Sequence, residues 1–357
     1  MRSFLNPKYA GLDPYTPGEQ PQDMQYVKLN TNESPFPPSP NVTEAGGREV
    51  EKLNLDCDPE CKALRQALAP IFGVDPGSIL PVNGSDEALY LAFAAFAGGD
   101  TAVAFPNISY GFYSAYASVN HLKTHVIPLK EDFSLDYRDY CGLNEMVVIA
   151  NPNAPTGTDI PLWQIEEILK SNPNNVVLID EAYVDFGGES CVPLTRKYDN
   201  LLVCQTFSKS RSMAGARLGV AIASEGIIRD LNTLKYSINP YNINRMTQAA
   251  GIAAARSDGY YRENCRIICQ NREYTARKLT ELGFTVLPSK ANFLFARHPQ
   301  LSGAAYYAQL KARGVLVRHF TKSEIQDFCR ITIGTREQMD ILLRQTWEIL
   351  KERGCTI

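Results

Sequence analysis

Short, continuously apolar runs alternate with helical patterns through the middle of the chain. The runs are TAVAF (101–105), MVVIA (146–150), NVVLID (175–180), LLVCQT (201–206) and GVAIA (219–223). Each is too short for a helix and lacks polar–apolar alternation, which predicts parallel strands that are covered on both faces. Several gaps are wide enough for a crossover helix, such as PLWQIEEILK (161–170), and favour a doubly wound α/β domain.

Apolar residues at helical spacing predict further helices at 60–72, 85–97, about 258–282, 301–313 and 336–352. Gly73 is placed to end the first of these, and Ser-Asp-Glu supplies an N-cap and an acidic first turn to the second. The last has one core-facing stripe, formed by Met339, Leu342, Leu343, Trp347 and Leu350.

The pattern also predicts how the chain divides. Residues 1–45 are rich in proline and aperiodic, which is typical of an extended arm rather than a packed helix. We expect a large mostly parallel α/β domain at 46–250 and a smaller α+β domain at 251–357, to which the later runs FTVLPS, NFLFAR, GVLVRHF and FCRITIG belong.

Composition narrows the possible partners. The 357 residues carry a net charge of −3, which argues against nucleic acid or an anionic membrane bound by bulk electrostatics. No apolar run approaches the ~20 residues of a membrane span, and the N-terminus lacks the apolar core of a signal peptide. Four histidines and nine scattered cysteines favour reduced thiols, a cytoplasmic location and no metal site.

Candidate chemistry lies where the apolar runs end, because ligands of open parallel sheets bind beyond the carboxyl ends of the strands. The runs are followed by PNISYGFY, NPNAPTG, EAY and FSKS. Asp180 closes an apolar run, so its carboxylate would stay ionised only beside a positive partner. Lys209 is suited to form a Schiff base with an aldehyde. Pyridoxal phosphate uses both groups, with Tyr183 donating to the ring hydroxyl and Tyr110 stacking on the ring.

The phosphate of such a cofactor requires donors, and NGSDE (83–87) supplies them. Backbone N–H groups near Gly84, Ser85 and Asp86 lie at the start of the predicted helix at 85–97 and form an anion site. Ser208 and Arg217, in TFSKSRSMAGARLG (206–219), would complete the cage.

Eight strings in register add a family resemblance: NTNESPF (30–36), NGSDE (83–87), NPNAPTG (151–157), DEAYVDF (180–186), TFSKSRSMAGARLG (206–219), ANF (291–293), GVLVR (314–318) and CRITIGT (329–335). Together they resemble the histidinol-phosphate aminotransferases, a branch of the fold-type I, class I/II pyridoxal-phosphate enzymes. The resemblance implies a homodimer with active sites near its interface, and transfer of nitrogen from histidinol phosphate to 2-oxoglutarate in histidine biosynthesis.

The resemblance also implies residue roles. The catalytic residues would be Lys209, Asp180 and Tyr183. The cofactor would be bound by Gly84, Ser85, Asp86, Tyr110, Asn153, Asp180, Tyr183, Thr206, Ser208, Lys209 and Arg217. The substrate would be bound by Tyr15, Asn30, Arg318 and Arg330, with Arg330 clamping the α-carboxylate.

Two departures from the family pattern affect the site. The family commonly has Asn directly before Pro-Thr-Gly, where its amide binds the ring oxygen, and this chain has Ala154. Either Asn153 substitutes for it or that hydrogen bond is missing. The family also commonly has Tyr-Pro-Asp where this chain reads Asp56-Cys57-Asp58. An aspartate would repel the partner subunit's cofactor phosphate, so we expect Asp56 to point elsewhere.

Other functions fit parts of the same pattern. An aromatic amino acid aminotransferase would use the same residues, and a lyase similar to threonine-phosphate decarboxylase would release carbon dioxide without an oxo-acid acceptor. A cofactor-dependent regulator would need a DNA-binding segment, and no basic helix-turn-helix is left over. A nicotinamide dehydrogenase is disfavoured because no GxGxxG follows the first apolar run.

Overall fold

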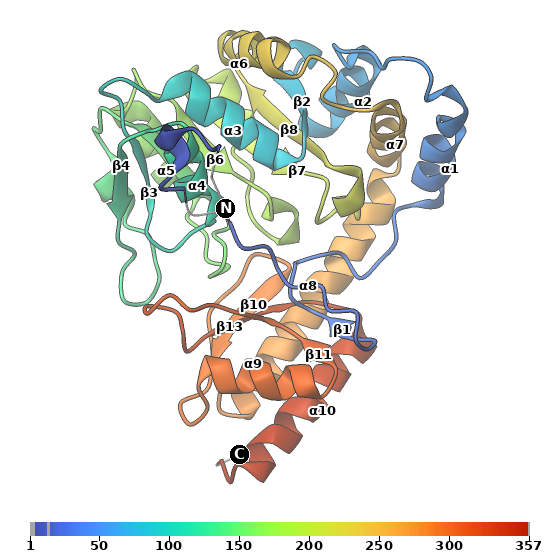
Figure 1. Ribbon diagram of the computed structural model, residues 1–357, viewed down its shortest axis with the longest axis vertical. Coiled ribbons are helices and arrows are strands. Elements are labelled where there is room, and N and C mark those ends of the chain that lie inside the picture. The colour runs from blue at the N-terminus through green and yellow to red at the C-terminus, as the bar shows by residue number, and fades with distance from the viewer. Residues whose placement is uncertain (1–3, 13–14, 356–357) are drawn as a thin grey trace.

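Seven strands form one large sheet (Figure 1) in a computed structural model that describes residues 4–12 and 15–355. In spatial order the strands are β2 (Ile79–Asn83), β8 (Leu218–Ala223), β7 (Leu201–Thr206), β6 (Val177–Asp180), β5 (Met146–Ala150), β3 (Val103–Pro106) and β4 (Thr124–Ile127). All run parallel except β8, which is antiparallel to both of its neighbours. The predicted α/β class is confirmed, with a sheet that is mixed but mostly parallel.

The parallel direction predicted for residues 219–223 is wrong. The chain between β7 and β8 contains only a short 3-10 turn, Ala214–Ala216, so no crossover helix carries it back for a parallel strand. Strands β2 and β4 were not predicted. Pro81 interrupts the first, and three of the four residues of the second are exposed, so neither has the apolar run of a central strand.

Helices cover both faces of the large sheet, which explains why its strands are apolar throughout. One face carries α3 (Ser85–Phe96), α4 (Phe112–Val119) and α6 (Glu225–Ile238). The other carries α2 (Lys62–Phe72), α5 (Leu162–Ser171) and α7 (Arg245–Arg256). Gly73 ends α2 in a left-handed conformation, as predicted. The N-cap of α3 is Gly84, and Ser85 is its first helical residue.

A second, antiparallel sheet forms the lower part of the molecule (Figure 1). Its strands, in order, are β12 (Arg318–His319), β13 (Cys329–Thr332), β10 (Phe293–Arg297) and β9 (Thr285–Val286). It packs with α8 (Asp258–Glu281), α9 (Gly303–Ala312) and α10 (Arg336–Glu352) around a separate core. Four residues of the stripe predicted for α10 are buried, but Trp347 is 43% exposed, so its predicted core position is wrong.

The N-terminal segment crosses from the small part to the large one. Strand β1 (Val27–Lys28) pairs in parallel with β11 (Val315–Leu316) of the small part. Helix α1 (Pro40–Arg48) then packs against α7 of the large part. The expectation of an extended chain is therefore wrong for residues 40–45, because Pro40 occupies the first helical turn, where proline is well tolerated.

Short 3-10 turns complete the described chain, at Pro7–Tyr9, Val50–Lys52, Pro76–Ser78, Tyr137–Tyr140, Val184–Phe186, Val192–Arg196 and Ala214–Ala216. Among the helices of residues 4–12 and 15–355, none is both long and apolar enough to cross a membrane.

Candidate active site

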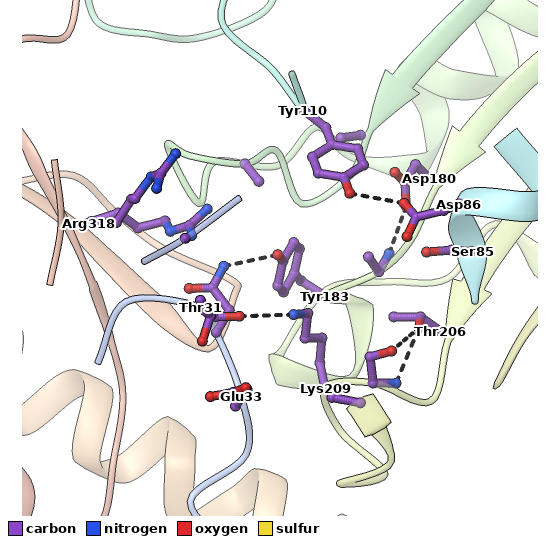
Figure 2. A pocket seen from close by; sticks show the side chains of 18 of the residues that line it. Thr31, Glu33, Ser85, Asp86, Tyr110, Asp180, Tyr183, Thr206, Lys209 and Arg318 are labelled. Atoms are coloured by element: carbon purple, nitrogen blue, oxygen red, sulfur yellow. Dashed lines mark hydrogen bonds between the residues drawn. The ribbon is translucent and has the colours of Figure 1, made fainter. Parts of the chain in front are cut away.

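A cavity of about 250 Å³ lies between the carboxyl edge of the large sheet and the small sheet (Figure 2). Thirteen of the predicted site residues line it: Tyr15, Asn30, Ser85, Asp86, Tyr110, Asp180, Tyr183, Thr206, Ser208, Lys209, Arg217, Arg318 and Arg330. Gly84 and Asn153 are the two predicted residues that do not. Side chains separated by up to 315 positions in the sequence thus meet at one site.

Strand direction explains how the large sheet contributes. Asp180 is the last residue of β6 and Thr206 the last of β7, and these strands are parallel neighbours. Because β8 runs the other way, its first residues lie beside the ends of β7 and β2. Arg217 directly precedes β8 and is thereby brought next to the start of α3. The antiparallel direction of β8, which the sequence pattern did not predict, therefore assembles this corner of the cavity.

Asp180 is buried, with 5% of its surface exposed. Its carboxylate accepts hydrogen bonds from the Tyr113 hydroxyl at 2.9 Å and from the Ala182 N–H at 3.1 Å. Burial raises the pKa of Asp180 to about 6, and the two hydrogen bonds only partly offset that rise. Both donors are neutral, so the carboxylate is stabilised further by any cation that enters the cavity.

Lys209 extends from the loop after β7, and its Nζ donates to the Thr31 carbonyl at 3.1 Å (Figure 2). Burial lowers the pKa of Lys209 to about 8, and the positive charge of Arg330 contributes to this decrease. A substantial share of the side chain is therefore the free amine at mildly alkaline pH. A lysine with these properties is suited to nucleophilic attack and to proton transfer.

The start of α3 forms an anion site against Arg217. The first N–H groups of a helix lack intrahelical partners and carry partial positive charge. Arg217 reaches this helix end, where its Nη2 donates to Asp86 Oδ2 at 2.8 Å. Gly84, at a φ of +73°, leaves room for it, because a Cβ atom there would collide with the Arg217 guanidinium. Gly84 therefore shapes the site without lining the cavity.

Other hydroxyls around this anion site are already oriented. The Thr206 hydroxyl donates to Ser208 Oγ at 2.9 Å, and the Ser208 N–H donates to Thr206 Oγ1 at 3.2 Å. The Ser208 hydroxyl proton is thus available to a ligand. The Tyr110 hydroxyl donates to Asp86 Oδ1 at 2.9 Å, which holds the Tyr110 ring over the cavity (Figure 2).

On the opposite wall, Arg318 on β12 and Arg330 on β13 are direct cross-strand neighbours. Like charges in this position repel each other unless an anion lies between them. Arg330 donates from Nη2 to the Asn30 carbonyl at 3.1 Å, while its buried Nε has no partner among the described residues. Burial lowers the pKa of Arg330 from its ordinary value. The pair is arranged to receive a carboxylate or a phosphate.

The N-terminal segment closes this side of the cavity. Arg318 donates to the carbonyls of Thr16 and Pro17, and the Asn30 amide donates to the carbonyl of Glu19 at 2.8 Å. The Tyr15 ring stacks on Phe112, with ring centroids 4.1 Å apart, and meets Tyr110 edge-on. Arg318 and Asn30 therefore line the cavity while also binding the segment that covers it.

Asn153 requires a correction. It is buried, and its amide donates to the Ile108 carbonyl at 3.0 Å and to Thr156 Oγ1 at 2.8 Å, while its oxygen accepts from Ser109. Both N–H groups are used, one by a neighbouring segment and one within the loop, so Asn153 does not replace the amide that Ala154 lacks. Ala154 itself faces the cavity. Asp56 is exposed and does not line the cavity of its own chain.

Among the polar residues that line the cavity, sequence reasoning missed Thr31, Asn32 and Glu33, and it also missed Tyr113, which holds Asp180. The first three belong to the string NTNES, which was visible, but its pattern does not indicate that the segment lies against Lys209. Tyr113 is fully buried, and its hydroxyl donates to Asp180. Among residues 4–12 and 15–355, no group of three or more His, Cys, Asp or Glu side chains could hold a metal ion.

Comparisons with known proteins agree over nearly the whole chain. The family described as aminotransferase class I and II matches residues 24–345. The histidinol-phosphate aminotransferase of Brachyspira hyodysenteriae is 48% identical and aligns with 98% of this chain and all of that protein. That of Marinomonas sp. is also 48% identical, over 96% of this chain and 98% of that protein.

A solved structure is similar in fold. The histidinol-phosphate aminotransferase of Sinorhizobium meliloti, in complex with pyridoxal-5'-phosphate, has a TM-score of 0.86, 23% identity and 99% coverage of both chains. The range that the family matches contains every residue lining the cavity except Tyr15, Pro17 and Gly18.

Proposed function

Because this chain belongs to the class I and II aminotransferases, we propose that it moves an amino group from histidinol phosphate to 2-oxoglutarate, in histidine biosynthesis, with pyridoxal phosphate as cofactor. One observation carries the proposal. A lysine of lowered pKa and a buried carboxylate face one cavity that has an anion site at each end. The named relatives act on histidinol phosphate, which supports the choice of donor.

The residues present fit pyridoxal phosphate. Asp180 is a buried carboxylate with neutral hydrogen-bond donors, and a protonated ring nitrogen would supply its missing cation. The α3 N-terminus, Ser208 and Arg217 would hold the phosphate. When bound, the cofactor supplies an aldehyde that reacts with primary amines and a ring that accepts electrons from the adjacent carbon.

Each residue then has a defined task. Lys209 Nζ would hold the cofactor covalently, and as the free amine it would take a proton from the substrate α-carbon and return it. Asp180 would keep the ring nitrogen protonated. The Tyr183 hydroxyl would donate to the ring oxygen, and Tyr110 would cover one face of the ring and exclude water.

Both substrates carry an anion close to the reacting carbon. In 2-oxoglutarate a carboxylate is attached directly to that carbon, and in histidinol phosphate a phosphate ester is attached through one CH2 group. Arg318 and Arg330 would bind either group, since a guanidinium offers a bidentate fork to both. A second cavity of about 590 Å³ shares Tyr15, Tyr110 and both arginines with the first, and it leaves room for the imidazole ring.

A donor panel tests the proposal. Purified protein is loaded with pyridoxal phosphate and mixed with histidinol phosphate, phenylalanine or threonine phosphate, with and without 2-oxoglutarate. We expect glutamate to form fastest from histidinol phosphate and only when 2-oxoglutarate is present. Faster turnover of phenylalanine would indicate an aromatic aminotransferase. Carbon dioxide released from threonine phosphate without an oxo acid would indicate a lyase.

We also propose a homodimer in the cytoplasm. Exposed apolar side chains occur on two segments, with Val50, Leu53 and Leu55 on one, and Tyr236, Ile238 and Tyr241 on the other. Exposed apolar side chains of this kind suit burial against a second copy. The nine free cysteines of the described chain suit a reducing compartment. Light scattering at micromolar concentration and cell fractionation would test the two statements.

A further inference from the structure

Asn32 holds the Tyr183 hydroxyl from the side opposite the large sheet. Its Nδ2 donates to the Tyr183 oxygen at 2.9 Å, and only 1% of the Asn32 surface is exposed. We propose that Asn32 is a positioning residue, which aims the Tyr183 proton at the cofactor ring oxygen in this chain. The inference rests on the proposed function, because it assigns a task toward the cofactor of that same site.

Thr332 on β13 holds the other end of the Asn32 amide. The Asn32 N–H donates to Thr332 Oγ1 at 2.9 Å, and the Thr332 hydroxyl donates back to Asn32 Oδ1 at 3.0 Å. In this arrangement the amide oxygen faces Thr332, and the NH2 group faces Tyr183.

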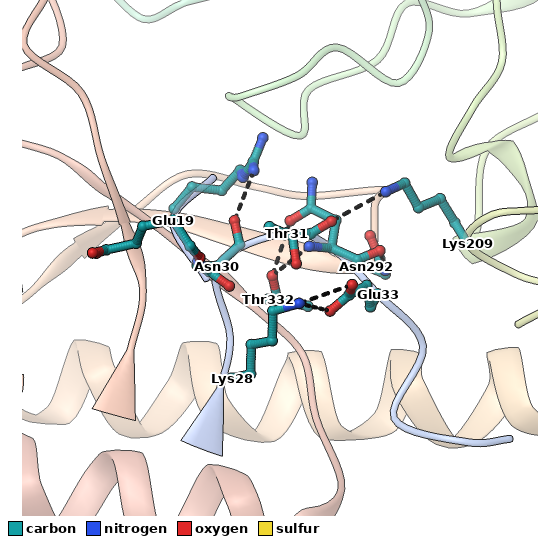
Figure 3. A network of polar contacts seen from close by, with 10 residues as sticks. Glu19, Lys28, Asn30, Thr31, Glu33, Lys209, Asn292 and Thr332 are labelled. Atoms are coloured by element: carbon teal, nitrogen blue, oxygen red, sulfur yellow. Dashed lines mark hydrogen bonds and ion pairs between the residues drawn. The ribbon is translucent and has the colours of Figure 1, made fainter. Parts of the chain in front are cut away.

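The backbone of Asn32 is also constrained, by its conformation and by a hydrogen bond. Its φ is +55°, a left-handed conformation that asparagine tolerates better than most residues. Its carbonyl accepts from Asn292 Nδ2 at 3.0 Å. Figure 3 shows Asn292 and Thr332 gathered around this segment, with Lys209 reaching toward it from the large part.

The hydrogen bond from Asn32 leaves the Tyr183 proton free for a ligand in the cavity. A phenol has one O–H, and the Tyr183 oxygen accepts from Asn32, so that proton remains free for another acceptor. The wall formed by Ala150, Pro152 and Ala154 has no side-chain donor. Asn153, beside it, uses its donors elsewhere. Tyr183 is therefore the donor that this side of the cavity offers to a ring oxygen.

Burial keeps the proton on the Tyr183 hydroxyl. Burial raises the pKa of Tyr183, Arg330 lowers it, and Asp180 raises it again. The net direction is upward, so the phenol remains a donor at the pH of the reaction. Replacing the Asn32 donor by an acceptor would turn the Tyr183 proton away from the cavity, without changing the size of the side chain.

A double-mutant cycle tests the inference. The variants are Asn32→Ala, Tyr183→Phe and the pair together, each loaded with pyridoxal phosphate. One measurement is kcat/KM for histidinol phosphate. The other is the pH midpoint at which the visible absorbance of the bound cofactor changes, because a ring oxygen that loses a donor holds a shared proton more tightly. We expect Asn32→Ala to reduce kcat/KM about tenfold, a ratio that corresponds to ~1.4 kcal/mol, and to raise the midpoint.

The coupling between the Asn32 and Tyr183 substitutions distinguishes a positioning role from general structural damage. If Asn32 acts through Tyr183, Asn32→Ala has little further effect in the Tyr183→Phe background. Asn32→Asp should lower kcat/KM more than Asn32→Ala, since the introduced carboxylate accepts the Tyr183 proton. Thr332→Val, which frees the amide to rotate, should move both readouts in the same direction by a smaller amount, and it substitutes for Asn32→Ala if that variant does not fold.

Asn172→Ala is the matched control, because Asn172 is equally buried and hydrogen-bonded but contacts only carbonyls and a serine away from the cavity. It should lower the melting temperature and leave the midpoint unchanged. An Asn32→Ala midpoint equal to the wild-type value, or an effect undiminished in Tyr183→Phe, would overturn the role of Asn32. Wild-type protein that neither binds the cofactor nor forms glutamate would instead overturn the proposed function.

Discussion

On the large-sheet wall of the cavity, Asp180 ends a buried strand and Lys209 lies in the loop after the neighbouring strand, whereas on the small-sheet wall Arg318 and Arg330 depend on the N-terminal segment. Asp180 is held by Tyr113 of α4 and by the Ala182 N–H, and the Lys209 side chain also reaches the N-terminal segment, at the Thr31 carbonyl. The second pair binds backbone carbonyls of residues 16, 17 and 30, about 300 positions away. Chemistry at the cofactor therefore rests mainly on the edge of the large sheet, and substrate recognition on contacts between distant segments.

Among these substitutions, we expect the replacement of Lys209, on the large-sheet wall, to lower activity most. Lys209→Ala should lose covalent cofactor binding and at least ~10³-fold in kcat, since no other amine in the cavity can move the α-proton. Absorbance of the purified protein and single-turnover kinetics measure the two effects. Lys235→Ala is the control, because that lysine is also buried but binds the Pro59 carbonyl outside the cavity. A Lys209→Ala protein with normal turnover would contradict the assignment.

Asp180→Asn should cause the second-largest fall in kcat. The amide keeps the shape but removes the charge that matches a protonated ring nitrogen, so we expect kcat to fall about 10²–10³-fold, as for other preorganised electrostatic groups. Glu181→Gln is its neighbour control: Glu181 is equally buried, but it is held by Ser190, Cys191 and Gln205 away from the cavity. Similar losses in both variants would indicate damage to the strand end rather than loss of a specific charge.

On the small-sheet wall, we expect substitutions to weaken substrate binding. Arg330→Ala should raise KM for 2-oxoglutarate about 10- to 100-fold, the range for lost hydrogen bonds to a charged group. The cofactor absorbance should not change. Arg297→Ala removes an exposed guanidinium of the same sheet and should leave KM within about twofold. If Arg330→Ala lowered cofactor affinity as strongly as it raised KM, the separation between the two walls would not hold.

The smallest effect concerns the stability of the cofactor-free protein. Asp180 has its pKa raised from 3.8 to about 6, so the folded state binds more protons than the unfolded state between these values. Its contribution is therefore complete below pH 3.8 and is lost as the pH rises to 6. At pH 7 we expect Asp180→Asn to stabilise the cofactor-free protein by about 1–3 kcal/mol, at ~1.4 kcal/mol per pKa unit.

Urea unfolding at pH 4 and pH 7 measures this effect, and the difference between variant and wild type should grow with pH. Glu181, with its pKa raised to about 7, contributes in the same direction in both proteins and cancels in the comparison. With pyridoxal phosphate added, the order should reverse, because the wild-type carboxylate then has its cation. An Asp180→Asn variant less stable than wild type without cofactor would show that the carboxylate is already compensated.

Particular elements show why sequence reasoning succeeded or failed. Helix α10 was predicted to its end residues, because its apolar periodicity is a local signal. Asp180 and Lys209 were found because a charged residue after a buried strand is conspicuous. Asn153 was chosen by its position beside Ala154, but the loop directs its amide inward. Asn32 was overlooked because no local pattern indicates that its partner is Tyr183.

The amino-acid sequence by itself determined helices α2, α3, α5, α8, α9 and α10, the central strands and the edge of the sheet that carries the chemistry, since hydrophobic periodicity and strand ends are properties of neighbouring residues. Only the tertiary structure decided the reversed direction of β8, the contact of Arg217 with the start of α3 and the hydrogen bond from Asn32 to Tyr183. These depend on contacts between segments far apart in the chain, whose free energies arise from packing and hydrogen bonding that no local pattern encodes.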